Sequence, residues 1–579
     1  MSCEGIDGFV SDEYRLGYLN HQEIRKLVTL LRDNDAIGSN LRNRSFENQV
    51  KEFEERAGRQ LLVALHEATM GRPFEDILLD EFKHVHPQRA QSLYLTVCLL
   101  NRLDVPVRAG LVARVHGIAF TEFREELFDP LEHVVETQMD RATRDYMYVA
   151  RHPEVAQIVF ERVLTEATDK YHEYIRVLKH LNISFSSDRT AFRQLIRARA
   201  LHELFPRYED VRAIFEVAED SAGREAFVYQ QMANYERIRP NGNYLRAYEL
   251  LQTARKLDSR DSSITHSLAV LARTQALNTN RPLERLKYRN EARSLLAPLL
   301  EASQPNSYAR HTAVELAIDD LEDLLRDVDS TDEDIRDSIR RVERNIERGQ
   351  QQFPDDHHLR IAESRFGRLL RDNARSRRAL EAAFASNPRD PYIAIRLADL
   401  YEQEGDLESA SNFIRKALDA NRGNKELNFQ YAWIRRAIDP IDVDTLVYHL
   451  GRAFTEGDQN YEAQFWYARY LFENPDIQKR QEAKAIFRRL RDVPMQPQAR
   501  HRVRDQMTAD GQPRQFIGTI TKKEMEYGFA TVDGRGDYVF FHKNNADDAT
   551  WDRLRSRGRV RFNIGFAFGG PRALGIETI

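Results

Sequence analysis

The sequence predicts a mainly α-helical protein in which a long array of helical repeats carries a small all-β barrel at its C-terminal end. First, the 579 residues exceed what a single hydrophobic core usually organises, so several domains or a repeat array are expected. Second, apolar residues recur at helical spacing over most of the chain up to about residue 505. Third, from Phe516 onward the pattern changes to short runs of alternating residues separated by glycine turns.

Composition narrows the class of protein. Hydrophobic residues make up 41% of the chain and charged residues 31%, a balance that favours elongated helical architectures with much surface per buried residue. The formal net charge of −5 means that binding to nucleic acid requires a local basic patch. Cys3 and Cys98 form neither a disulfide framework nor a zinc motif, so no metal or cofactor is expected. The N-terminus lacks the features of a signal peptide, and the apolar runs Leu61–Leu65 and Leu93–Leu100 are too short for a membrane span, which together predict a cytoplasmic protein.

Residues 1–140 are predicted to form a helical, winged-helix-like region. Pro87 occupies a first-turn position ahead of one of the helices, and a short link from Leu103 to Pro106 precedes the next. Helices connected by such a tight turn are compatible with a winged-helix or helix-turn-helix unit. The expected helices are Asp12–Arg32, Phe46–Leu65, Phe74–His84, Ala90–Arg102 and Ala109–Ile118.

Within this region, the segments Gly58–Phe82 and Ser92–Ile118 resemble the helical and winged-helix arm that follows the nucleotide-binding core of STAND-type signalling NTPases. The sequence contains no G-x-x-x-x-G-K-[ST] motif, whose backbone amides and lysine would hold the phosphates of a nucleotide. The resemblance therefore implies the helical and winged-helix arm without the nucleotide-binding domain. We expect either loss of the P-loop domain or its presence on another chain.

Residues 141–505 are predicted to form a repeat array. The clearest repeat begins at Pro391, where small Ala398 and Ala410 would let two antiparallel helices approach closely and Gly405 would form the turn between them. Leu397, Tyr401, Ile414 and Ala417 complete the pattern, which resembles a tetratricopeptide repeat (TPR). Weaker copies of the second-helix pattern begin at Ala247, Ala292 and Ala483. The resemblance implies a superhelix whose concave surface binds a partner protein.

After a linker at 506–514, residues 515–579 are predicted to form a β-barrel. The segment contains Gly and Pro turns between runs of alternating residues. Five strands in so short a segment match the strand count of an OB-type barrel. The expected strands are Phe516–Thr521, Tyr527–Val532, Asp537–His542, Arg559–Ile564 and Arg572–Glu577.

The amino-acid sequence of residues 515–579 resembles that of a cold-shock domain over nearly its full length. Tyr527-Gly528-Phe529 corresponds to the first RNA-binding motif of that family, and Asp537–His542 to the second. The resemblance implies an outward stacking set for unpaired bases, with Val539 and Phe541 pointing inward, and we interpret Gly528 as leaving room for a base. The expected nucleic-acid-binding residues are Lys522, Lys523, Tyr527, Phe529, Phe540, His542, Arg559 and Arg561.

Local charge favours the same site. Residues 514–579 contain eleven Lys or Arg against eight Asp or Glu, a net charge of +3 in an otherwise acidic protein. Arg559 and Arg561 would share one face of a strand and contact phosphates. Lys522 and Lys523 stand near the place where the family has a tryptophan–phenylalanine pair, so weak and largely base-unspecific binding is expected.

No motif predicts catalysis. His66-Glu67 is followed by Met70 where a zinc-binding HExxH helix needs its second histidine. The acidic run Asp319–Asp334 lacks the glycine and final glutamate of a calcium loop, and Ser330 or Thr331 is expected to cap a helix that starts there.

Three functional interpretations follow from the sequence. The first is a non-catalytic scaffold whose barrel binds single-stranded RNA or DNA while the repeats bind a protein. The second is a sensor or regulatory part of a STAND-type ATPase in bacterial stress response or antiphage defence. The third makes the barrel a protein-interaction module. The sequence leaves open the choice of RNA or DNA, the protein partner and the oligomeric state.

Overall fold

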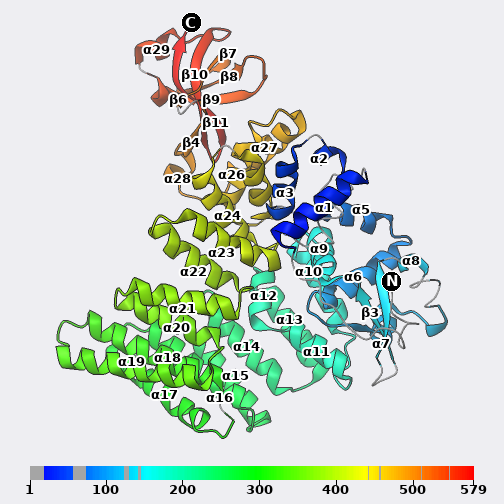
Figure 1. The fold of residues 1–579 in the computed structure, drawn as a ribbon, viewed down its shortest axis with the longest axis vertical. Coiled ribbons are helices and arrows are strands. Elements are labelled where there is room, and N and C mark those ends of the chain that lie inside the picture. The colour runs from blue at the N-terminus through cyan, green and yellow to red at the C-terminus, as the bar shows by residue number, and fades with distance from the viewer. Residues whose placement is uncertain are drawn as a thin grey trace. The chain divides into compact units, whose positions relative to one another are not determined.

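The structure is a computed structural model that describes residues 19–34, 36–42, 44–55, 74–122, 125, 129–132, 134–140, 145–304, 306–440, 442–455, 458–509, 512–546 and 548–579. The chain is mainly helical and ends in a small closed β-barrel, which confirms the predicted fold class (Figure 1). It divides into two compact units, Met1–Glu404 and Gly405–Ile579. Among the described helices, none combines the length and the apolar character that crossing a bilayer requires.

Unit 1 begins with short helices and a small sheet. α1 starts at His21, where the Asn20 side chain and Glu23 form a capping box, while Asp12 and its neighbours lie outside the described residues. Residues 56–73, which include the C-terminal end of the predicted helix Phe46–Leu65 and most of Gly58–Phe82, also lie outside them. The elements are α1 (His21–Asp33), α2 (Ser39–Arg42), α3 (Phe46–Glu55), α5 (Phe74–His84), α6 (Gln88–Asn101), β1 (Val107–Arg108), α7 (Ala109–His116), η1 (Phe120–Glu122), α8 (Asp129–Leu131), β2 (Val135–Asp140) and β3 (Asp145–Ala150).

The strands of this region form an antiparallel sheet in the order β1-β3-β2. Asn101, at the end of α6, donates to the carbonyl of Val105 and accepts from the amide of Ala150, so one buried side chain ties the helix to β3. A helix, a short strand, a second helix and then a hairpin is an order compatible with the predicted winged-helix-like region. The assignment to a STAND-type arm stays a prediction.

Helices follow one another from residue 153 to the end of unit 1. Consecutive helices pack in pairs, α14 with α15, α16 with α17, α18 with α19 and α20 with α21 (Figure 1). Their bounds are α9 (Pro153–Val163), α10 (Ala167–Leu178), α11 (Ser186–Leu195), α12 (Ala198–Leu204), α13 (Tyr208–Ala222), α14 (Ala226–Ile238), α15 (Tyr244–Leu257), α16 (Ser262–Asn278), α17 (Pro282–Leu300), α18 (Ser307–Arg326), α19 (Asp332–Gln352), α20 (His357–Leu369), α21 (Asn373–Ser386) and α22 (Pro391–Gln403).

The small residues of the repeat pattern are buried as predicted. Ala247 and Ala292 of the weaker copies are fully buried. In the clearest repeat, Ala410 is fully buried and Ala398 is only 2% exposed. Gly405 has φ +82, the left-handed conformation that its turn requires and that glycine adopts without strain. Thr331 caps α19 through a capping box with Asp334, which confirms one of the two predicted caps.

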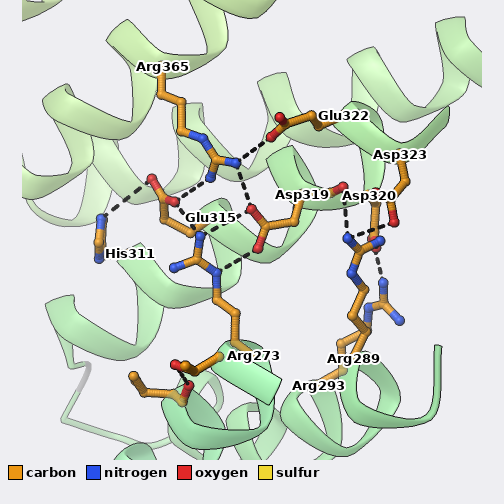
Figure 2. Close-up of polar contacts among 12 residues, drawn as sticks. Arg273, Arg289, Arg293, His311, Glu315, Asp319, Asp320, Glu322, Asp323 and Arg365 are labelled. Carbon is orange, nitrogen blue, oxygen red and sulfur yellow. Dashed lines mark hydrogen bonds and ion pairs between the residues drawn. The ribbon is translucent and has the colours of Figure 1, made fainter. Parts of the chain in front are cut away.

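Stacked helices of unit 1 are joined by a network of buried ion pairs (Figure 2). Asp319 of α18, only 2% exposed, accepts from Arg273 of α16 at 2.7 Å and from Arg365 of α20 at 2.8 Å. Burial alone would raise the pKa of Asp319, but the hydrogen bonds and charges of the two arginines outweigh it and lower that pKa. Glu315 also bridges Arg273 and Arg365, each at 2.6 Å. The network therefore links helices from three successive pairs.

Unit 2 combines the last helices with the barrel. The helices are α23 (Leu407–Ala420), α24 (Lys425–Ile438), α25 (Val443–Arg452), α26 (Tyr461–Leu471), α27 (Ile477–Leu490), α28 (Pro497–His501) and α29 (Asp548–Arg553), with the 3-10 turn η3 (Lys543–Asn545). The strands are β4 (Asp505–Gln506), β5 (Thr508–Ala509), β6 (Gln512–Pro513), β7 (Gln515–Lys523), β8 (Tyr527–Val532), β9 (Tyr538–His542), β10 (Arg559–Ala567) and β11 (Gly570–Thr578). The segment predicted as a linker, 506–514, thus contains β5 and β6.

The barrel closes through five strands in the order β7-β8-β9-β11-β10, with β10 pairing back to β7. The β9–β11 pair is parallel and the other pairs are antiparallel. A closed barrel of five strands is consistent with an OB-type fold, and its strands overlap the five that the sequence predicts.

The barrel packs on the helices of its own unit. Phe566 of β10 contacts Phe472, which follows α26, and Phe487 of α27, with ring centroids 5.4 and 6.0 Å apart. Asp537, fully buried at the start of β9, pairs with Lys484 of α27 at 2.7 Å and with Arg535 at 2.9 Å. Apolar and charged contacts together fix the barrel on α26 and α27.

Candidate nucleic-acid interface

Alternation along β8 and β9 builds an aromatic outer face. Successive side chains of a strand point to opposite faces of the sheet, so residues two apart share one face. Val539 and Phe541 of β9 are fully buried in the barrel, which confirms the predicted inward pair. Phe540 between them and Phe529 of β8 lie half-buried on the outer face, and Tyr527 is 37% exposed. Residues interpreted as a stacking set are therefore on the outside of the barrel.

Strand register brings these side chains into rows. Phe529 lies opposite Phe540, and Tyr527 lies opposite His542. In the strand register, Lys522 of the neighbouring strand β7 lies opposite Phe529. On the other side of the β8–β9 pair, Arg572 of β11 lies opposite Phe540. Lys522, Phe529, Phe540 and Arg572 consequently form one row across four strands, which we call the aromatic row.

The rings of the interface contact one another. The centroids of Phe529 and Phe540 lie 5.6 Å apart with their planes at 69°, an edge-to-face pair. Tyr527 stacks on Phe540 at 6.0 Å with an interplanar angle of 22°. Such contacts are favourable for aromatic pairs and hold the ring planes in fixed orientations. The outer face of the barrel therefore carries a preorganised set of rings.

Gly528 has a different role from the one predicted. It is buried and faces the interior, where an added Cβ would lie 2.3 Å from Cζ of Phe541 and 2.6 Å from the carbonyl oxygen of Lys522. The space that glycine leaves is therefore filled by Phe541 from inside the barrel. A side chain at this position would clash with the Phe541 ring and with the backbone of β7, and the interpretation of Gly528 as room for a base is wrong.

Cations border the aromatic row at both ends. The Arg572 guanidinium lies 5.2 Å from the centre of the Phe540 ring and donates to Nδ1 of His501 in α28 at 2.9 Å. Burial lowers the pKa of Arg572, but an arginine stays protonated at any physiological pH. At the other end, Lys522 pairs with Glu524 at 2.9 Å, and the hydrogen bond to Glu524 raises the pKa of Lys522.

The remaining predicted cations divide into two groups. Arg559 and Arg561 both lie exposed on the outer face of β10. In the β7–β10 strand register they lie opposite Thr519 and Ile517, respectively. Arg559 bonds Asp533 at 2.6 Å, whereas Arg561 forms no ion pair with any described residue. Lys523 is separate from the interface, because its ammonium donates to the Trp551 carbonyl at 2.8 Å and lies over the Trp551 ring.

Sequence reasoning omitted two residues of this face. Tyr538 shares the outer face of β9 with Phe540 and His542 and is 62% exposed, and its period-two spacing from them was the available signal. Arg572 was counted only as local charge. Its place beside Phe540 depends on the parallel β9–β11 pairing, which belongs to the strand order of the barrel and not to sequence spacing.

Comparisons with known proteins concern the helical part of the chain. Residues 370–430 match the family model described as tetratricopeptide repeat. Among solved structures, a thermophilic TPR protein of Thermus thermophilus is 19% identical with a TM-score of 0.28, over 36% of this chain and 98% of that one. Yeast Tom70 is 13% identical with a TM-score of 0.30, over 58% of this chain and 73% of that one. The human IFIT1 dimer with PPP-AAAA is 13% identical with a TM-score of 0.32, over 71% and 89%.

No curated protein sequence matches the chain significantly. The structural likenesses have TM-scores too low to carry an argument about function. The family match and the paired helices together establish TPR-like repeats, an architecture suited to a protein-interaction scaffold.

Proposed function

We propose that this chain is a non-catalytic scaffold that binds single-stranded RNA or DNA on the outer face of its barrel, while its TPR-like repeats bind a partner protein. The aromatic row is the observation that supports the nucleic-acid part. Unpaired bases stack on flat rings without regard to sequence, and phosphates are attracted to flanking cations. The match at residues 370–430 supports the protein-binding part.

The expected affinity follows from the number of rings and cations. Each stacked base contributes about 1–3 kcal/mol. Tyr527, Phe529 and Phe540 contact one another, so they serve two or three neighbouring bases rather than a long strand. Phosphate contacts by Arg561, Arg572 and one or two further cations would make the logarithm of the binding constant fall with the logarithm of salt at a slope of about −2 to −3. Weak, salt-sensitive binding is therefore expected.

Fluorescence anisotropy of labelled single-stranded RNA and DNA tests the proposal. The intact protein is compared with Phe529→Ala/Phe540→Ala at two salt concentrations, and Tyr248→Ala on α15 controls for loss of an exposed ring elsewhere. We expect salt-sensitive binding that the double variant loses and the control retains. Absence of binding, or equal binding by the double variant, would contradict it and favour a protein-interaction role for the barrel.

A second candidate is the sensor or regulatory part of a STAND-type signalling ATPase. The order of helices and strands between α6 and β3 favours it, because it is compatible with a winged-helix arm. Purification of the chain from its native host with bound proteins tests this candidate. Recovery of a P-loop protein whose ATP hydrolysis depends on this chain is expected, and recovery of none would leave the scaffold as the better explanation.

A further inference from the structure

Unit 1 contains a cavity of about 360 Å³ between the helices α20, α21 and α22. Its volume lies in the range of small-ligand sites, about 300–1,000 Å³. Its lining combines the apolar side chains of Ile361, Leu380 and Leu400 with polar and basic ones. The lining residues that could bind a ligand are Arg368, Arg371, Asn373, Tyr392, Arg396 and Gln403.

Two of the three arginines of this cavity lack the partners that other arginines of unit 1 have. Arg365 on the same helix, α20, is neutralised by carboxylates in the buried network (Figure 2). In contrast, neither Arg368 nor Arg371 forms an ion pair or side-chain hydrogen bond with any residue that the structure describes, and both are exposed. Arg396 pairs with Asp399 at 4.0 Å, and its guanidinium lies 5.2 Å from the centre of the Tyr392 ring. Asp399 is the sole acidic residue of the described lining. Its charge against those of the three arginines gives the cavity a net charge of +2.

Arg371 also adopts an unusual backbone conformation. Its φ is +59, in the left-handed region that disfavours L side chains. Arg371 directly precedes Asp372, the N-cap of α21, just as Gly405 precedes Asp406, the N-cap of α23 in the next repeat. Gly405 satisfies the same turn without strain at φ +82. An arginine held in a strained conformation where glycine would serve the turn better points to a function for its side chain.

We infer that this cavity binds a nucleotide through its phosphate group. A phosphate monoester carries close to two negative charges at neutral pH, which matches the net charge of the cavity better than a single carboxylate does. Guanidinium groups bind phosphate oxygens in bidentate geometry. Tyr392, 46% exposed beside the arginines, offers a ring for the base, and the amides of Asn373 and Gln403 can bond its polar edge. The site is independent of the barrel interface.

Two sources can supply this chemistry, a free nucleotide and the phosphorylated end of an RNA strand. Titration of the full chain with ATP that carries a fluorescent ribose label examines the first. For the second, 5′-monophosphorylated and 5′-hydroxyl RNA of one sequence are compared in the Phe529→Ala/Phe540→Ala background, which removes the barrel contribution. Preference for labelled ATP identifies free nucleotides, and preference for the 5′-phosphorylated strand identifies RNA ends.

The decisive variant is Arg368→Ala/Arg371→Gly, which removes two guanidinium groups and relieves the strained backbone. We expect it to weaken binding of the preferred probe at least tenfold and to leave the melting temperature unchanged or higher. Arg378→Ala, an exposed arginine of α21 outside the cavity, is the matched control and should bind like the parent chain. Equal binding by the decisive variant, or binding of neither probe in a phosphate-dependent way, would overturn the inference.

Discussion

At the scale of single residues, Phe540 is the centre of the barrel interface. Its ring contacts the rings of Phe529 and Tyr527, and the Arg572 guanidinium lies 5.2 Å from its centre. A ring with aromatic neighbours and a cation cannot turn freely, so little conformational entropy remains to be lost when a base stacks on it. The contribution of this position should depend on the flat ring rather than on its apolar volume.

Phe540→Leu tests that dependence, because leucine keeps much of the apolar volume and removes the ring. We expect affinity for single-stranded oligonucleotides to fall about tenfold, which corresponds to one lost stacking contact. The stability of unit 2 should change by less than about 1.5 kcal/mol, since the residue is only half-buried and the swap is conservative. Anisotropy measures the affinity and urea unfolding the stability. An unchanged affinity would show that the ring does not stack on bases.

At the scale of elements, two turns between helices each depend on one residue with a positive φ angle. Arg371 and Gly405 occupy equivalent turn positions with φ +59 and +82. A Cβ added at Gly405 would meet nothing within 4 Å, so a substitution there costs backbone strain and no steric clash.

Gly405→Ala should therefore destabilise the chain by about 1–2 kcal/mol, the cost of an L residue in the left-handed region. Arg371→Gly is the reverse experiment and should raise the free energy of unfolding by up to about 1 kcal/mol, because the strain relieved exceeds the entropy that glycine adds to the unfolded chain. Urea titration of both variants measures the effects. A stabilised Gly405→Ala would contradict the assignment of strain to this turn.

The β8–β9 connection is the second element whose energetics rest on few residues. Asp537 is fully buried, and its carboxylate is neutralised by Lys484 of α27 and by Arg535. Arg535 also donates to the carbonyl of Phe472, at the end of α26. One carboxylate thus couples the barrel to two helices.

Asp537→Asn should lower the free energy of unfolding of unit 2 by about 2–4 kcal/mol, since removing one member of a buried pair leaves the other charge uncompensated. Lys484 is partly exposed, which places the expected value at the lower end of this range. A double-mutant cycle with Lys484→Met isolates the pair, because the combined change should cost less than the sum of the single ones. Additive effects would show that Lys484 does not stabilise Asp537.

At the scale of the whole molecule, sequence patterns predicted elements well and long-range pairings poorly. The resemblance to a cold-shock domain correctly placed Val539 and Phe541 inside the barrel and Phe540 outside it, and alternation, a local property of a strand, separates the two faces. The position of Arg572 beside Phe540 needed the strand order. In the same way, the acidic run from Asp319 gave no sign of the partners of Asp319, because Arg273 and Arg365 lie 46 residues away in either direction and meet it only through helix stacking.

The same stacking makes the stability of unit 1 depend on pH. Burial lowers the pKa of His311 on α18 to about 4, despite the opposing charge of Glu315, so the folded chain excludes a proton that the unfolded chain binds. Stability contributed by the neutral ring is present above the ordinary histidine pKa of about 6.5 and is lost as pH falls from there towards 4. Between pH 7.5 and 5 the loss of folding free energy should reach up to about 2 kcal/mol.

The variant His311→Gln cannot take up the proton. It should lose correspondingly less stability over this pH interval in urea titrations. His172→Gln, at an exposed position of α10, should retain the parent chain's pH dependence. A His311→Gln variant that is as acid-sensitive as the parent chain would assign the effect to other groups.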